Sequence, residues 1–154
     1  GDGVAVFVGV RAGDDLIYIA ESGGDHIMGY EARSNIRRTM LATAGGKALL
    51  AALPDAERDA YLRRHGSAQA ALVREYLEEH EEITRTGIAT NFTRNGKRYA
   101  IATTLHNATG KPLAAITLVG SAATLKPREK KVSQLLLKHV DAWANRSVQP
   151  REPI

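Results

Sequence analysis

The residues best suited to binding chemistry form the short segment Thr43-Ala44-Gly45-Gly46, which directly precedes an apolar run from Ala48 to Leu53. That run has no β-branched residue and stops at Pro54, which favours a buried helix over a strand. Thr43 is a suitable N-cap, and the first amides of a helix lack intrahelical partners while the helix dipole adds positive charge there. A carboxylate would therefore fit this helix end. Glycine has no Cβ, so Gly45 and Gly46 either admit a ligand or allow tight packing of the turn, and the pattern leaves both interpretations open.

Other catalytic or metal-binding chemistry has little support in the sequence. The five histidines show no pair at metal-ligand spacing, and no serine lies in a nucleophile-elbow motif. The segment 45–48, Gly-Gly-Lys-Ala, differs from a phosphate-binding loop because the first glycine is missing and Ala48 replaces the residue that would hold magnesium. The apolar face of the predicted helix over 69–85 includes Leu77 and His80, and that of the helix from Pro127 includes His139. We expect both histidines to be partly buried there. We predict no enzyme, no metal and no cofactor.

Composition indicates an ordinary globular domain. The chain has 154 residues, of which 44% are hydrophobic and 25% charged, and one compact domain is expected at this length. It contains no cysteine, which excludes disulfides and thiolate sites and favours the cytoplasm. No apolar run is long enough for a membrane span, and residues 1–4 lack the features of a signal peptide. The net charge of +4 permits contact with nucleic acid without requiring it.

Alternating hydrophobicity and turn residues divide the chain into strands and helices. Strands are predicted over 4–10, 16–21, 26–31, 88–92, 98–105 and 112–119, with hairpin turns at 12–15, 94–97 and 107–110. Helices are predicted after the Thr43 cap, over 54–65, over 69–85 and from Pro127 onwards, followed by a frayed tail from 148 to 154. Because strands linked by hairpins alternate with blocks of helices, the order indicates an α+β fold.

A pocket can be inferred where two predicted strands present small side chains opposite Gly45 and Gly46. Residues two apart on a strand share a face. Ala100, Ala102 and Thr104 then form one face, Thr103 lies on the other, and Leu113, Ala115, Thr117 and Val119 line a face of the next strand. Small residues would leave room for a ligand, and Thr117 could offer it a hydroxyl. Alternatively, Thr103 and Thr117 are present only because threonine forms strands well.

The segment 43–51, Thr-Ala-Gly-Gly-Lys-Ala-Leu-Leu-Ala, resembles the Thr-Ala-x-Gly-Lys-Ala-Leu-Leu-Ala signature of the effector-binding domain of IclR-type bacterial transcriptional regulators. The opening hairpin with Leu16–Ile19 and the segments 83–89, 101–102 and 114–120 follow in the family's order. The resemblance implies a GAF-like domain with a central antiparallel sheet flanked by helices, in cytoplasmic homodimers or homotetramers. We expect this domain over residues 1–147 and a flexible tail over 148–154. In such regulators an N-terminal winged helix-turn-helix, absent from this chain, binds DNA.

The resemblance also implies where an effector would bind. Its carboxylate would be held at Thr43, Ala44, Gly45 and Gly46, and the pocket side chains would be Asn91, Ala100, Thr117 and Val119. The family often has an acidic residue, a cysteine and two serines at the last four positions, so polar groups have been lost here. This predicts an apolar or aromatic organic acid as the effector.

The leading hypothesis is therefore a non-enzymatic sensor of a small carboxylic acid that controls DNA binding of the intact regulator through a rearrangement of subunits. Two alternatives stay open. The first is an oligomerisation domain with a vestigial pocket, and the second, less favoured, is a GAF-like enzyme.

Overall fold

A single antiparallel sheet of six strands organises the chain. The computed structural model describes residues 3–23, 37–93 and 95–148, with side chains up to residue 143, so the strand predicted over 26–31 lies outside the described residues. The strands are β1 (Ala5–Ala12), β2 (Asp15–Gly23), β3 (Arg37–Thr39), β4 (Ala89–Thr93), β5 (Arg98–His106) and β6 (Pro112–Ser121). They lie in the order β3-β2-β1-β6-β5-β4, which brings the N-terminal hairpin beside the last strand. The predicted α+β class is confirmed.

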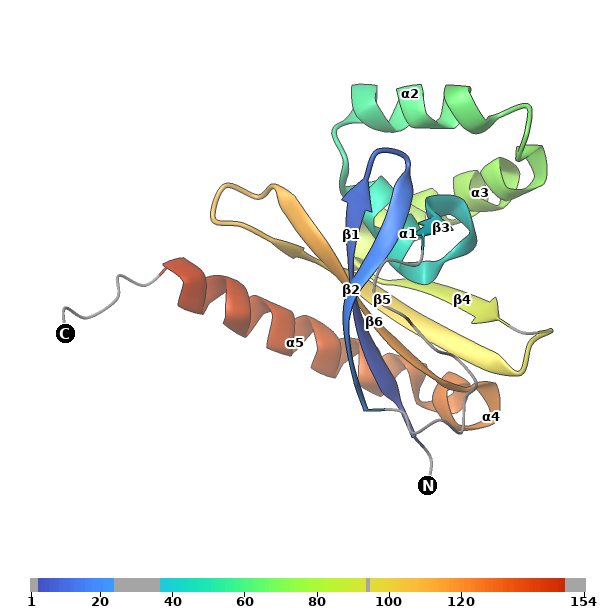
Figure 1. Cartoon of the computed structure of the whole chain (residues 1–154). Helices are drawn as coiled ribbons and strands as arrows, with labels where there is room; N and C mark the ends of the chain where they lie inside the picture. The colour runs from blue at the N-terminus through green and yellow to red at the C-terminus, as the bar shows by residue number, and fades with distance from the viewer. Residues whose placement is uncertain (1–2, 24–36, 94, 149–154) are drawn as a thin grey trace.

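Helices cover both faces of this sheet. The helices are α1 (Ala44–Ala52), α2 (Asp55–His65), α3 (Ala70–Thr86), α4 (Ala122–Leu125) and α5 (Glu129–Val148), with 3-10 turns η2 (Met40–Ala42) and η3 (Lys126–Arg128). In Figure 1, α1, α2 and α3 lie on one side of the sheet and α5 crosses the other side. None of the helices in the described ranges combines the length and the apolar character that crossing a membrane requires.

Local signals in the sequence account for most of the element boundaries. Asn95 and Gly96 both have positive φ angles, 56° and 82°, as the predicted Asn-Gly hairpin turn requires. Gly87 ends α3 in the left-handed region with φ 77°. The chain breaks differently near the C-terminus: instead of one helix from Pro127, it forms α4, η3 and then α5. Ser121 caps α4 by accepting a hydrogen bond from the Thr124 amide at 3.2 Å.

Strand alternation separates two hydrophobic cores. The larger core lies between the sheet and α1 to α3, and its fully buried large residues are Phe7, Leu16, Met40, Leu50, Tyr61 and Tyr76. The smaller core lies under α5 and contains Tyr99, Ile101, Ile116, Leu125, Leu136 and Val140. Ala100 and Ala102 of β5 belong to the first core and Ile101 to the second, which confirms the predicted division of faces.

The predicted apolar faces of α3 and α5 are wider than the surfaces that actually pack. Leu77 is 55% exposed, because α3 contacts the core through Tyr76 and Ile83 instead. His139 is exposed, contrary to prediction, because α5 packs through Leu136 and Val140. The helical spacing of apolar residues therefore predicted a wider buried face than either helix has.

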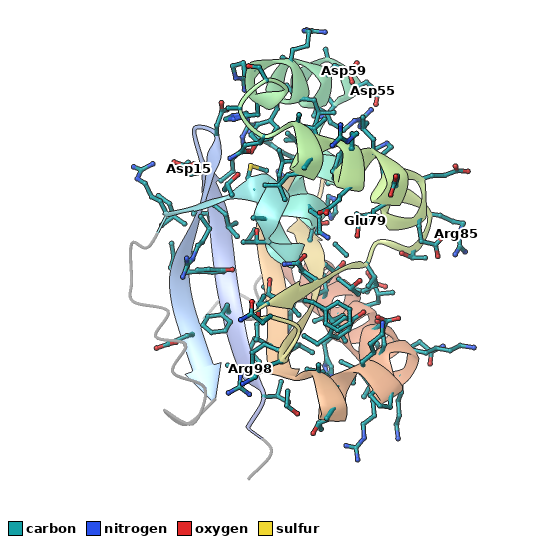
Figure 2. All side chains as sticks on the ribbon, turned by 90° about the vertical axis from the view of Figure 1, so that its right-hand side faces the viewer. Asp15, Asp55, Asp59, Glu79, Arg85 and Arg98 are labelled. Atoms are coloured by element: carbon teal, nitrogen blue, oxygen red, sulfur yellow. The ribbon has the colours of Figure 1, made fainter. Side chains whose placement is uncertain are left out.

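A buried lysine fixes the position of α1. The Lys47 side chain is only 6% exposed, and its ammonium lies 2.8 Å from a Glu79 carboxylate oxygen of α3. It also donates a hydrogen bond to the Thr90 carbonyl of β4 at 2.7 Å. Figure 2 shows Glu79 on α3, the helix that packs beside α1. One ammonium thus joins α1 to α3 and β4, through partners 32 and 43 residues further along the chain.

An ion-pair cluster joins the β1–β2 hairpin to the end of α2. Both carboxylate oxygens of Asp14 accept hydrogen bonds from Arg64, at 2.9 and 2.6 Å, and one lies 2.9 Å from His65 Nε2. The hydrogen bonds from the Arg64 guanidinium, and then those from His65, hold the pKa of Asp14 well below its usual range against the opposing effect of burial. Folding therefore favours the charged form of this carboxyl.

We predict that removing Glu79 destabilises the domain more than removing Lys47. Glu79→Ala leaves a buried ammonium without its counter-charge and, because Glu79 itself is 43% exposed, should lower the free energy of unfolding by about 2 kcal/mol. Lys47→Met removes the charge itself and leaves only the Thr90 carbonyl unpaired, at a cost of about 1 kcal/mol. Urea unfolding measures both, with Glu78→Ala as the matched control on the exposed side of α3. Equal effects of Glu79→Ala and Glu78→Ala would contradict this role.

We predict an acid-sensitive contribution from Asp14. Because the folded-state pKa is depressed, this contribution is present above the unfolded value near 3.9 and is lost as the pH falls below it. Asp14→Asn should lower stability at neutral pH by up to about 1 kcal/mol and flatten the fall of stability between about pH 5 and pH 2. The control is Asp59→Asn on the exposed surface of α2. Parallel pH profiles for wild type and Asp14→Asn would refute the assignment.

Candidate functional site

The start of α1 has the capped geometry that the sequence predicts. Thr43 has extended backbone angles, and its hydroxyl accepts a hydrogen bond from the Gly46 amide at 3.0 Å. The Lys47 amide donates to the Thr43 carbonyl at 3.0 Å, which begins the helical ladder. The cap thus uses the Gly46 amide, and the earlier amides of Ala44 and Gly45 are those that helix geometry leaves without an intrahelical partner.

Both glycines are required by packing within the domain. A Cβ on Gly46 would lie 2.3 Å from the Met40 carbonyl oxygen and 2.4 Å from the Met40 Cα. A Cβ on Gly45 would lie 2.8 Å from Thr117 Oγ1 and 3.2 Å from the Ala115 Cβ. Of the two interpretations left open by the sequence, tight packing therefore explains the glycine pair without a ligand. It also means that Gly46 cannot carry a side chain in this fold.

The strand residues named from the sequence meet beside this helix end. Asn91, Ala100 and Val119 are neighbours across β4, β5 and β6. Ala100 and Val119 are buried in the core that α1 covers. The Asn91 side-chain amide donates to the Ala42 carbonyl at 2.9 Å, just before the helix. The structure thus brings the predicted strand positions to the side of the sheet that faces the 43–46 segment.

Thr117 is the unusual member of the group. It is 2% exposed, and its hydroxyl has no hydrogen-bond partner among the described residues. It faces the first turn of α1 at the Gly45 position. Thr103, on the other face of β5, donates from Oγ1 to the Gly87 carbonyl at 2.6 Å and so serves the structure. Since a buried hydroxyl is normally paired, Thr117 requires an explanation that Thr103 does not.

Two residues of this region were not predicted from the sequence. Thr93 follows Asn91 by two positions on β4, so both share a face, and its hydroxyl is also buried and unpartnered in the described part of the chain. Lys47 was considered only as a phosphate-loop lysine. A lysine inside an apolar helix is a sign of a buried ion pair, although the sequence does not identify the partner, which the structure shows to be Glu79.

One histidine in the described part of the chain pairs with a tyrosine of the same helix. His80 lies on α3, where its Nδ1 is 2.8 Å from the Tyr76 hydroxyl. Burial lowers the pKa of His80 and raises the pKa of Tyr76, so both are neutral near pH 7. Within residues 3–23, 37–93 and 95–148, no three His, Asp or Glu side chains gather closely enough to hold a metal ion.

The fold and the helix end together define a GAF-like α+β domain, with a central antiparallel sheet facing the capped start of a buried helix. Comparison with protein families gives a more specific result, because the model of the bacterial transcriptional regulator IclR C-terminal family matches residues 2–147. The chain belongs to this family. A comparison with curated protein sequences finds no significant match.

Solved structures of transcriptional regulators share the fold. A regulator from Rhodococcus sp. RHA1 has 23% identity and a TM-score of 0.77, with 92% of this chain and 61% of that chain covered. The Thermotoga maritima IclR has 20% identity and a TM-score of 0.76, with 96% and 62% covered. This chain thus spans about three fifths of those proteins.

One similar structure contains a small molecule. It is a double mutant of the inducer-binding domain of the Acinetobacter transcription factor PobR in complex with 3-hydroxybenzoic acid. Identity is 16% and the TM-score is 0.74, with 92% of this chain and 87% of that chain covered. At these identities the likeness concerns the fold.

The two threonines give a matched prediction on stability. Thr103→Val removes a hydrogen-bonded hydroxyl and should lower the free energy of unfolding by about 1 kcal/mol. Thr117→Val replaces an unpaired buried hydroxyl with a methyl group of similar shape and should leave stability unchanged or raise it. Thermal or urea unfolding of both variants measures the difference. A loss for Thr117→Val as large as that for Thr103→Val would show that the Thr117 hydroxyl has a partner in the free protein.

Proposed function

We propose that this domain senses a small organic acid, which binds at the start of α1 through the segment 43–46. The observation that carries the proposal is the buried hydroxyl of Thr117, which faces the first turn of that helix and has no hydrogen-bond partner among the described residues. The amides of Ala44 and Gly45 and the positive end of the helix dipole suit a carboxylate. A ligand at this place would give the hydroxyl a partner.

The surroundings favour an acid with an apolar or aromatic body. Ala100 and Val119 offer only hydrocarbon, and the Asn91 amide is already used on the Ala42 carbonyl. Thr117 and Thr93 are then the side-chain hydroxyls left to select a polar substituent. The PobR inducer-binding domain, which has the same fold, was solved with 3-hydroxybenzoic acid, and an acid of this kind suits the pocket proposed here.

In the intact regulator, the proposed effector acts on the arrangement of subunits. We place the sensing domain over residues 1–147, within a homodimer or homotetramer whose winged helix-turn-helix domains bind DNA. Similar solved regulators are longer than this chain, which spans 61% of the Rhodococcus protein. An effector can shift such an assembly only by binding one arrangement more tightly than the other. No catalytic step is needed for this function.

An oligomerisation domain with a vestigial pocket is the second candidate. It is favoured by the packing of Gly46 against Met40, which explains the glycine turn without any ligand. The contact of Asn91 with the Ala42 carbonyl likewise closes the site with the protein's own atoms. The two candidates differ in one measurable property, which is saturable binding of an acid.

A thermal-shift screen of aliphatic and aromatic carboxylic acids tests the proposed function. An acid at 100 times its dissociation constant should add about 2.7 kcal/mol to stability. For the best acid, Thr117→Val should weaken binding by about three- to tenfold, because one neutral hydrogen bond is lost. Thr103→Val, on the opposite face of β5, should bind with wild-type affinity.

Each other outcome has a definite meaning. No shift across the panel, together with a stable oligomer, would support the vestigial pocket. Turnover of an acid by the purified protein would support an enzyme. Binding that is insensitive to Thr117→Val would remove this hydroxyl from the site.

A further inference from the structure

A hollow lies at the opposite end of α1 from the proposed effector site. It has a volume of about 550 Å³ and lies between the end of α1, the start of α2, Arg11 of β1 and the β5–β6 turn. Its apolar lining consists of Leu49, Ala52, Leu53, Pro54, Pro112 and Leu113. Figure 1 shows the β5–β6 hairpin extending beyond the rest of the sheet on this side. Cavities of roughly 300–1,000 Å³ hold small organic ligands in proteins.

The apolar part of this groove has a floor and a rim. Leu49 is 3% exposed and belongs to the main core, so it forms a fixed floor. Leu113 is 50% exposed, although it is the second residue of a largely buried strand. A large apolar side chain held at the edge of a hollow can be covered by a ligand that enters the hollow.

The polar part of the groove favours an anion. Its charged residues are Arg11, Lys111 and Glu57. Arg11 is paired with Glu57 at 3.3 Å and also donates to the Gly13 carbonyl at 2.8 Å. Lys111 has no carboxylate within ion-pair distance in the described part of the chain. Among the described residues, the positive charge of Lys111 therefore has no counter-charge in the groove.

Lys111 is also well positioned by its backbone. The Asn107 side-chain oxygen accepts hydrogen bonds from the Lys111 amide at 2.9 Å and the Thr109 amide at 3.0 Å. This closed turn holds the lysine at the groove mouth beside Pro112. Hydrogen bonds within the turn thus order the backbone that carries the Lys111 side chain.

We propose that this groove binds an amphipathic organic anion. Its aromatic or aliphatic body would lie against Leu49, Leu53 and Leu113, and its anionic group would lie at Lys111. The site is separate from the proposed effector site, because the nine-residue helix α1 places roughly 13 Å between them. The proposal does not depend on acid binding at Thr117. A ligand in this groove would lie against the C-terminal end of α1, while the N-terminal end of α1 faces the proposed effector site.

Binding of anilinonaphthalene sulfonate to the 154-residue chain tests this proposal. This fluorescent probe combines an aromatic body with a sulfonate, as the groove requires. Saturable binding at one site per chain is expected, with amide NMR shifts concentrated at Leu49, Leu53 and Leu113. Lys111→Glu and Leu113→Asp should each weaken the probe's affinity by about tenfold or more.

Matched variants distinguish the groove from general surface binding. Lys97→Glu changes an exposed lysine in the β4–β5 turn, and Leu135→Asp changes a leucine of α5 with 48% exposure, close to the 50% of Leu113. Both should retain wild-type affinity and the folded NMR spectrum. The proposal is overturned if no saturable binding occurs, if Lys97→Glu weakens binding as much as Lys111→Glu, or if the shifts lie at residues 44–46 instead.

Discussion

The rest of the site depends on the two contacts that the buried ammonium of Lys47 makes. An ammonium that is almost fully removed from water must be compensated, and here Glu79 of α3 and the Thr90 carbonyl of β4 do so. These two contacts therefore fix the position of α1 relative to α3 and β4. The position of its N-terminus against β6 follows from that anchor, and so does the close approach of Gly45 to Thr117.

The start of α1 is packed tightly within the domain, but the hydroxyl of Thr117 beside it has no partner among the described residues. Gly46 fits against Met40 so closely that no side chain can replace its hydrogen, and Thr43 satisfies one first-turn amide. These contacts stabilise the turn without a ligand. Thr117 is different, because its hydroxyl is enclosed by the turn and paired with nothing described. Packing within the domain therefore explains the glycine turn but leaves the Thr117 hydroxyl unexplained.

Membership of the IclR C-terminal family and low identity to solved relatives are consistent with each other. The identities of 14–23% leave most side chains different. The fold survives because it needs only the strand alternation, the two cores and the small residues under α1. Pocket chemistry has no such protection, since each polar position can change without disturbing the sheet. The family model therefore identifies the domain, while the ligand is proposed from the residues of the site.

Features set by neighbouring residues were predictable from the sequence alone. The Thr43 cap, the Asn95-Gly96 turn, the left-handed Gly87 and the division of β5 between two faces all depend on residues a few positions apart. The family signature added the positions that meet at the start of α1, although not what they contact. Tertiary structure alone decided the partner of Lys47, the contact of Asn91 with Ala42, the exposure of Leu77 and the groove beside Lys111. These features join residues tens of positions apart, and such contacts depend on how elements pack, which no local pattern specifies.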